Sequence, residues 1–245
     1  MDPRVAPRRL TQFVRRTAAV AFALGLGGCQ VAAQLPPSVG GRSLLNSSRS
    51  VIVQLFEWRW DDIAQECEAW LGPNGYGAVQ ISPPHEHRVM DEGNTPFPWY
   101  QRYQPVSYKL SSRSGNQTEL ANMVSRCHRA GVKVYADVVI NHMASAGVGQ
   151  GSGGSNFDTA KFAYDAVPYD QGDFHEPCVI ESADYTEKPW RVQRCQLLGQ
   201  QDLDTGSEKV QTTISEAMNE LLALGIAGFR IDSAQHIPPV HLAKI

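Results

Sequence analysis

Apolar residues in the middle of the chain form short runs that alternate with stretches of helical spacing. The runs are rich in Val, Ile and Leu and predict strands at residues 51–56, 77–82, 132–140 and 226–232. In the stretches between them, apolar residues recur every three or four positions and predict helices at residues 60–71, 116–130 and 208–224. We expect the third run to be buried on both faces, as parallel strands usually are. The alternation therefore predicts βα units around a parallel sheet.

The regular pattern is interrupted between residues 142 and 201. No helical or strand periodicity of any length is visible there, and residues 147–155 are a glycine- and serine-rich loop sequence. The chain therefore predicts an α/β barrel of which residues 50–141 and 202–245 form the first four βα units. Residues 142–201 form an irregular inserted subdomain after strand three. A doubly wound sheet is the alternative, but no glycine-rich nucleotide loop follows any of the strands.

The first 33 residues have the features of an export signal. Arginines at positions 8, 9, 15 and 16 precede an apolar run at residues 18–27, which is too short to span a bilayer. Leu26-Gly27-Gly28-Cys29 resembles a bacterial lipoprotein box, which predicts a lipidated Cys29 and membrane attachment at the cell envelope. Cleavage after Ala33 is the alternative and would release a soluble extracellular protein. Residues 34–49, rich in Pro, Ser and Gly, then form a linker.

Composition narrows the class of protein. The 245 residues are 42% hydrophobic with a formal net charge of -3, which argues against a disordered acidic chain and against a nucleic-acid-binding protein. In an exported protein, four cysteines besides Cys29 predict two disulfides, with three possible pairings. They are Cys67, Cys127, Cys178 and Cys195. A zinc site is disfavoured, because no Cys-x-x-Cys spacing occurs.

Candidate chemistry lies at the ends of strands three and four. Asp137 and His142 fall near the carboxyl end of the third run, where parallel barrels place reactive groups, although Asp137 taken alone favours a structural hydrogen-bonding role. In the fourth run, the two-residue period places Arg230 and Asp232 on the same side. We expect the guanidinium to keep Asp232 ionised, as a nucleophile at a sugar carbon must be. A structural ion pair is the alternative for this motif in isolation.

Together these motifs resemble the α-amylase family of glycoside hydrolases. Asp137-Val-Val-Ile-Asn141-His142 and Gly228-Phe-Arg-Ile-Asp-Ser-Ala-Gln-His236 are similar to the first two signature regions of the family. Three further segments are most like those of the animal-type, chloride-dependent α-amylases and their bacterial relatives: Leu55-Phe-Glu-Trp58, Val79-Gln-Ile-Ser-Pro-Pro84 and Arg102-Tyr-Gln-Pro-Val-Ser-Tyr108. The resemblance covers roughly residues 50–245 and implies a (β/α)8 TIM barrel, of which this chain holds the first four units.

The resemblance implies a catalytic role for several residues. Asp232 would be the nucleophile that forms a covalent glycosyl intermediate, and Arg230 would orient it and bind chloride. The remaining residues would contact an α-glucan substrate such as starch, glycogen or maltooligosaccharides. They are Trp99, Tyr100, Tyr103, Gln104, His142, Gln235 and His236. At position 235 the family usually has Lys, and at position 100 it usually has Trp, so the contacts of Gln235 and Tyr100 differ from the family pattern.

The resemblance also implies a calcium ion and a disulfide pattern. The calcium ligands would be the side chains of Asn141 and Asp202 with the main-chain carbonyls of Gln193 and His236. All four groups offer oxygen atoms, which this hard cation prefers. Such an ion would tie the inserted subdomain to the barrel. The disulfides would join Cys67 to Cys127 and Cys178 to Cys195, and a monomer is expected.

One catalytic requirement is not met within the sequence. Retaining hydrolysis needs two carboxyl groups about 5 Å apart, one of them protonated. The chain stops nine residues after His236, before the regions where the family keeps its general acid Glu and a third carboxylate. We therefore expect a partial α-amylase that is inactive and poorly stable alone. The alternatives are a related α-glucan transglycosidase and a non-catalytic glucan-binding or vestigial protein.

Overall fold

A computed structural model describes residues 49–91 and 96–245. The predicted leader with Cys29, and the linker apart from residue 49, lie outside the described residues. Lipidation and export therefore stay predictions. Within the described ranges, no helix combines the length and the apolar character that crossing a membrane requires.

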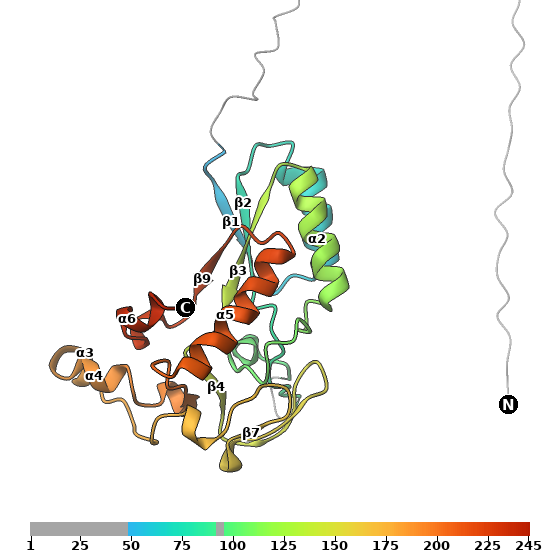
Figure 1. Cartoon of the computed structure of the whole chain (residues 1–245). Coiled ribbons are helices and arrows are strands. Elements are labelled where there is room, and N and C mark those ends of the chain that lie inside the picture. Colours follow the sequence, from blue (N-terminus) through green and yellow to red (C-terminus); the bar gives the residue numbers. More distant parts are fainter. Residues whose placement is uncertain (1–48, 92–95) are drawn as a thin grey trace, which may run out of the picture. The chain divides into compact units, whose positions relative to one another are not determined.

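The core of the fold is a parallel sheet of four strands. They are β1 (Ile52–Leu55), β2 (Ala78–Ile81), β3 (Lys133–Val138) and β9 (Gly228–Ile231). Their order across the sheet is the order in the sequence, and each pairs in parallel with the next. This is the arrangement of four consecutive strands of a β/α barrel, as the sequence predicts (Figure 1).

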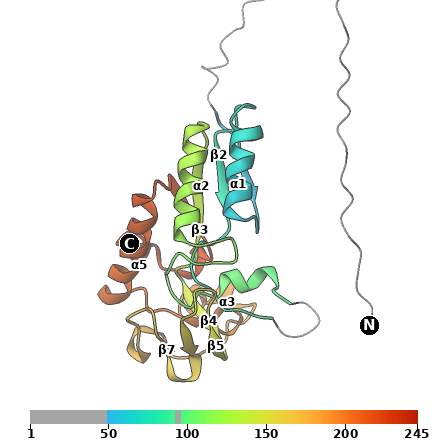
Figure 2. The ribbon, with the colours of Figure 1, turned by 90° about the vertical axis from the view of Figure 1, so that its right-hand side faces the viewer.

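Helices cover one face of this sheet. The face carries the rows Val53, Val79, Val134 and Leu55, Ile81, Ala136, Phe229, which are set side by side by the strand register. These residues pack in the main core with the apolar sides of α1 (Trp60–Glu66), α2 (Gln117–Arg129) and α5 (Glu208–Ala223). Figure 2 shows α1 and α2 side by side along the sheet.

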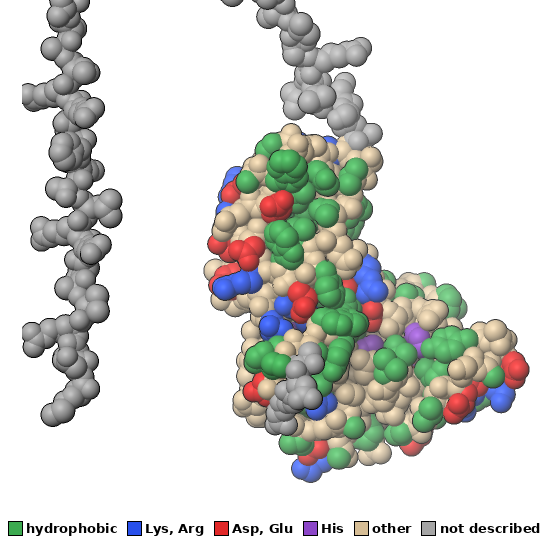
Figure 3. All heavy atoms as spheres, turned by 180° about the vertical axis from the view of Figure 1, so that it is seen from behind, with side chains coloured by type: hydrophobic (Ala, Val, Ile, Leu, Met, Phe, Trp, Pro, Cys, Tyr) green, Lys and Arg blue, Asp and Glu red, His purple; other side chains and the backbone are tan. Residues whose placement is uncertain are grey.

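The other face of the sheet is largely open. Ile52 is 55% exposed, and in β3 Lys133 is exposed and Tyr135 half-buried. The expectation that strand three is buried on both faces is therefore wrong over its first half, because no described element packs on that side there. Burial of both faces is reached only towards the carboxyl end, at Ala136, Asp137 and Val138. Seen from behind, the molecule also shows hydrophobic side chains among charged ones at its surface (Figure 3).

Local signals fix the start of α2. The Asn116 side chain accepts a hydrogen bond from the Glu119 amide at 3.0 Å, and the Glu119 carboxylate accepts one from the Asn116 amide at 2.8 Å. This reciprocal capping box satisfies two amides that the first turn cannot pair. The helix therefore begins at Gln117, directly after the capping residue.

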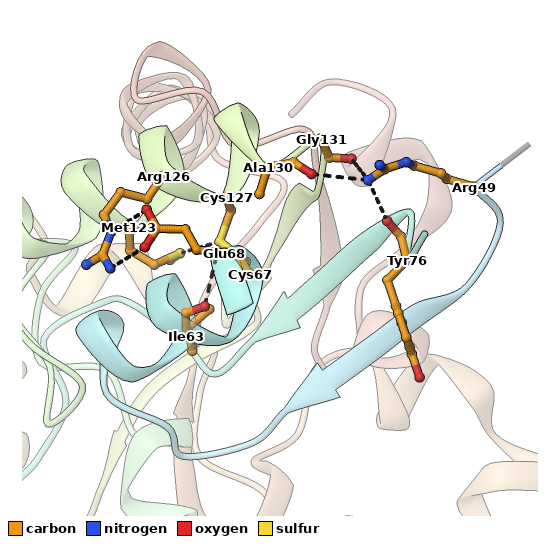
Figure 4. Close-up of a disulfide and its surroundings, with 10 residues drawn as sticks. All are labelled: Arg49, Ile63, Cys67, Glu68, Tyr76, Met123, Arg126, Cys127, Ala130 and Gly131. Carbon is orange, nitrogen blue, oxygen red and sulfur yellow. Dashed lines mark hydrogen bonds and ion pairs between the residues drawn. A yellow bond between two sulfur atoms is a disulfide. The ribbon is translucent and has the colours of Figure 1, made fainter. Parts of the chain in front are cut away.

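A disulfide and an ion pair join the first two helices (Figure 4). Cys67, at the start of the π-helix Cys67–Leu71 that continues α1, is bonded to Cys127 of α2. Arg126 beside it pairs with Glu68 at 2.6 Å. Arg49 donates to the carbonyl groups of Ala130 and Gly131 that follow α2, where a positive charge complements the helix dipole.

The inserted region is more ordered than the sequence indicates. It contains two small antiparallel sheets: β4 (His142–Ser145) pairs with β8 (Gln200–Asp202), and β5 (Val148–Gln150), β6 (Asn156–Asp158) and β7 (Ala163–Tyr164) form the other. The inserted subdomain that the sequence predicts as irregular therefore contains short strands that the pattern does not indicate. Strands of two to four residues carry too few positions to show an alternation, and this explains why the pattern gives no signal.

The second disulfide lies in this region. Cys178 is bonded to Cys195, beyond the single-turn helices α3 (Asp184–Glu187) and α4 (Pro189–Val192). Both pairings are those that the resemblance implies. Disulfides persist mainly in oxidising compartments, in keeping with the predicted export. The chain ends with the short helix α6 (Pro239–Leu242).

One buried imidazole has no hydrogen-bond partner among the described residues. His85, after β2, is 2% exposed, and neither ring nitrogen is paired. Its ring packs edge-on against Tyr108 with centroids 5.6 Å apart. Burial lowers the pKa of His85 from 6.5 to about 4, because the charged form would lose its hydration.

His85 is therefore expected to make the fold less stable as the pH is lowered. The unfolded chain binds a proton at His85 below about pH 6.5 and the folded chain only below about pH 4, so the associated stability is lost as pH falls through this window. His85→Phe should raise the free energy of unfolding by roughly 2 kcal/mol more at pH 5 than at pH 8, measured by urea unfolding. A packing cost of the larger ring would act equally at both pH values. The exposed His128→Phe is the control, and an unchanged pH dependence in His85→Phe would contradict the account.

Candidate active site

A cleft of about 520 Å³ lies at the carboxyl ends of the strands. Six of the residues predicted to act on substrate line it: Trp99, Tyr100, Tyr103, Gln104, Arg230 and Asp232. The carboxyl ends of parallel barrel strands are the usual place for catalytic groups, because several loops meet there. The folding of the sheet thus brings together residues that are more than 130 positions apart in the sequence.

Arg230 holds two carboxylates at once. It lies opposite Asp137 in the register of β3 and β9, and its Nη1 atom is 2.7 Å from Asp137 Oδ1 and 2.8 Å from Asp232 Oδ1. The Ser233 hydroxyl donates to the other oxygen of Asp232 at 2.8 Å. The backbone of Ser233 lies in the left-handed region, with φ of 52°. The Asp232 carboxylate, with 15% of its side chain exposed, is therefore held from two sides while it still reaches the cleft.

Asp137 lies behind this pair and does not line the cleft. It is fully buried, and the Tyr103 hydroxyl donates to its Oδ2 at 2.8 Å. Burial raises the pKa of Asp137 to about 6, against the opposing effect of Arg230 and Tyr103. Burial also disfavours the charged form of Arg230. The carboxylates of Asp137 and Asp232 outweigh this effect and raise the pKa of the guanidinium. The structural hydrogen-bonding role expected for Asp137 fits this geometry.

Aromatic side chains form one wall of the cleft. The 3₁₀ helix Trp99–Tyr103 presents Trp99 and Tyr100, which are 54% and 45% exposed. The Trp99 ring meets those of Tyr100 and Tyr103 edge-on, with centroids 5.8 and 6.0 Å apart. Exposed rings in a fixed geometry offer flat apolar surfaces to a ligand at low entropic cost.

Five further residues line the cleft that the sequence does not single out: Ser145, Leu197, Leu198, Gln200 and Ser233. Leu198 is 88% exposed, and its backbone lies in the left-handed region, with φ of 53°. An apolar pair followed by glycine, Leu197-Leu198-Gly199, is the one available signal in the sequence. It carries no periodicity, and its place at the cleft follows only from the folding of the inserted region.

Three predicted substrate ligands do not line the cleft. His142 is buried and donates through Nε2 to the Tyr103 carbonyl at 3.1 Å, and burial lowers its pKa to about 4. His236 is also buried and donates through Nδ1 to the Val192 carbonyl at 2.9 Å. Gln235 is exposed, with its amide 3.5 Å from His236 Nε2. Both histidines therefore bind main-chain carbonyls of neighbouring segments in this structure.

The predicted calcium ligands fall into two pairs, and the members of each pair lie close together. Asn141 and Asp202 are both 2% exposed, and their side chains approach to 3.2 Å. Gln193 follows Val192, which is bonded to His236 as described above. Burial raises the pKa of Asp202 to about 6, although His175 Nδ1 lies 2.7 Å from its Oδ2 and lowers it. The described residues contain no cluster of three or more acidic, His or Cys side chains that could hold a metal. A cation here would therefore need carbonyl ligands as well.

The chain is similar to several known proteins. Residues 78–244 match the family model described as the catalytic domain of α-amylase. An α-amylase of Tribolium castaneum is 49% identical over 199 residues, which are 81% of this chain and 40% of that protein. The crystal structure of α-amylase I from Eisenia fetida superposes with a TM-score of 0.76 at 43% identity, over 80% of this chain and 40% of that one. A variant of the earthworm protein, solved with maltohexaose, matches equally well.

These matches cover most of this chain and a smaller share of each relative. The chain spans about 40% of the length of the relatives it matches. The family model extends over residues 78–244, which is more than half of the chain. The chain therefore belongs to the α-amylase family of glycoside hydrolases.

Proposed function

We propose that this chain supplies the nucleophile and one wall of the glucan-binding cleft of an α-amylase, which hydrolyses α-1,4-glucosidic bonds of starch or glycogen with retention of configuration. The observation that carries the proposal is the carboxylate of Asp232, fixed by Arg230 at 2.8 Å and by the Ser233 hydroxyl at 2.8 Å at the cleft. The names of the relatives and the maltohexaose complex of the earthworm protein support the choice of substrate.

The chemistry assigns a separate task to each group. Asp232 attacks the anomeric carbon, and a covalent glycosyl ester forms as the bond to the leaving oxygen breaks. Arg230 keeps Asp232 ionised and oriented before the attack, and it balances Asp137 behind it. Trp99 and Tyr100 supply faces on which pyranose rings can stack.

A protonated carboxyl group must complete the reaction. Asp232 is the only carboxylate among the described residues that line the cleft. Asp137 cannot serve as general acid, because it is fully buried and both of its oxygens bind Arg230 and Tyr103. Hydrolysis therefore requires a second carboxyl about 5 Å from Asp232 that these residues do not provide.

Replacing the nucleophile tests the proposal directly. In the longest reading frame that contains this sequence, Asp232→Asn should lower kcat on starch by roughly 10⁴-fold or more, since the neutral amide cannot form the ester. Affinity for maltohexaose, measured by calorimetry, should change little. Asp62→Asn, the same substitution at an exposed position of α1, should leave kcat unchanged.

Product analysis separates this function from its alternatives. Full activity of Asp232→Asn would contradict the proposal. Maltohexaose binding without any turnover in the unsubstituted protein would favour a glucan-binding protein. Products longer than the supplied oligosaccharide would identify a transglycosidase.

We further propose that calcium binds through Asn141, Asp202 and the main-chain oxygens of Gln193 and His236. Asn141 and Asp202 support this: both are buried, the Asn141 amide nitrogen donates to Asp202 Oδ1 at 3.2 Å, and a cation would compensate the buried carboxylate, whose pKa burial raises to about 6. Bound there, the ion would link β4 and β8 of the inserted region to the segments around α4 and β9. The fit to chloride is poorer, because Arg230 Nη1 is already shared by two carboxylates and this cluster is negative overall.

Calcium is expected to stabilise the fold. Adding Ca²⁺ to the chelator-treated protein should raise Tm by several degrees, because a ligand that binds only the folded state stabilises it. Asp202→Asn should remove most of this shift, while the exposed Asp62→Asn should keep it. A Tm that is identical with Ca²⁺ and with excess chelator would contradict the proposal.

A further inference from the structure

The aromatic wall of the cleft stands on a very short helix with a buried side. Trp99, Tyr100 and Tyr103 of the 3₁₀ helix Trp99–Tyr103 face the cleft, whereas Gln101 and Arg102 are buried, with 0% and 3% exposure. One turn of helix does not hold its own conformation in water. The contacts of the buried side, together with the hydrogen bonds that the Tyr103 carbonyl accepts from His142 and Gln200, therefore set where the aromatic rings lie.

Arg102 makes most of these contacts. Its Nε donates to Glu57 Oε1 at 3.0 Å, and its Nη1 donates to the Ser114 hydroxyl at 2.9 Å. Ser114 in turn donates to the Trp58 carbonyl at 2.7 Å. The side chain of Arg102 is 2% exposed, so loss of Glu57 would leave a largely buried charge without this carboxylate partner. The guanidinium thus ties the 3₁₀ helix to the segment that follows β1.

Glu57 is held in an unfavourable backbone conformation for this contact. It follows β1 with φ of 65°, in the left-handed region that a residue with a side chain rarely adopts. Its amide donates to the hydroxyl of Ser82, which follows β2, at 2.7 Å. Such strain persists where the surroundings demand it, and it is common near functional sites. The carboxylate of Glu57 is therefore fixed relative to the ends of two strands.

A continuous series of contacts leads from this ion pair to the nucleophile. Tyr103 is the neighbour of Arg102 and donates to Asp137 at 2.8 Å. Asp137 and Asp232 share the guanidinium of Arg230, at 2.7 and 2.8 Å. A displacement of the 3₁₀ helix would therefore move the aromatic wall and also remove one hydrogen bond from the carboxylate behind the nucleophile.

We propose that Glu57 and Arg102 are positioning residues for glucan hydrolysis, which set the 3₁₀ helix and hence Trp99 and Tyr103 relative to Asp232. The proposal rests on the function proposed above. Neither residue lines the cleft, so both act only through the helix and Tyr103.

Glu57→Gly separates positioning from folding. Glycine adopts positive φ without strain, which offsets part of the stability lost with the ion pair, so Tm should stay within about 5 °C of the unsubstituted protein. In the longest reading frame that contains this sequence, kcat/KM on maltohexaose should fall about a hundredfold, through both a lower kcat and a higher KM. Glu57→Gln, which keeps an oxygen acceptor for Arg102, should recover most of this loss.

The control is Glu68→Gln, which removes the carboxylate from the more exposed ion pair with Arg126, away from the cleft. It should leave kcat and KM unchanged. Unchanged kcat and KM in a folded Glu57→Gly protein would overturn the positioning role. A lower Tm with normal kcat and KM would equally overturn it, since it shows a purely structural ion pair.

Hydrogen exchange tests the positioning role independently of activity. In Glu57→Gly, amides of residues 99–104 should exchange at least about tenfold faster, because the helix loses the carboxylate that holds its buried side, and Glu68→Gln should not change them. Unchanged exchange would overturn the proposal even in an active enzyme. Absence of hydrolysis by the unsubstituted protein would instead contradict the proposed function, and faster exchange would still show that the pair holds the helix.

Discussion

A single guanidinium between two carboxylates organises the cleft. Asp137 is buried at the end of β3, where an unpaired charge would be strongly destabilising. Arg230 lies beside it in the strand register and reaches it at 2.7 Å, and the same nitrogen reaches Asp232 at 2.8 Å. The need to pair a buried charge thus fixes the direction of the arginine, and the arginine fixes the carboxylate that faces the cleft.

The inserted region completes this arrangement from the other side. The carbonyl of Tyr103 accepts hydrogen bonds from His142 at 3.1 Å and from Gln200 at 3.0 Å, which belong to the paired strands β4 and β8. The excursion after β3 therefore returns to the 3₁₀ helix that carries the aromatic wall. Barrel, helix and inserted region meet at one residue, Tyr103, whose hydroxyl binds Asp137 and whose main chain binds the insertion.

The sequence predicts the barrel strands well and the inserted region poorly, for a physical reason. Strands β1, β2, β3 and β9 and helix α5 bury apolar faces, so periodicity reveals them. The strands of the insertion are too short for a period, and Leu198 reaches the cleft through a left-handed turn that no pattern indicates. The resemblance assigns His142 and His236 to the sugar, and this stays a prediction. Their hydrogen bonds to main-chain carbonyls of other segments depend on tertiary contacts alone, so the sequence does not indicate them. The disulfide pairings were implied by the family resemblance, because spacing alone left three choices open.

The most direct measurement is to trap the intermediate on the longest reading frame that contains this sequence. A fluorinated glucosyl fluoride forms the glycosyl ester quickly and releases it slowly, so that peptide mapping by mass spectrometry can locate the labelled side chain. The account predicts a single label on the peptide that contains Asp232. A label on another carboxylate, or an unchanged yield of label after Asp232→Asn, would contradict it.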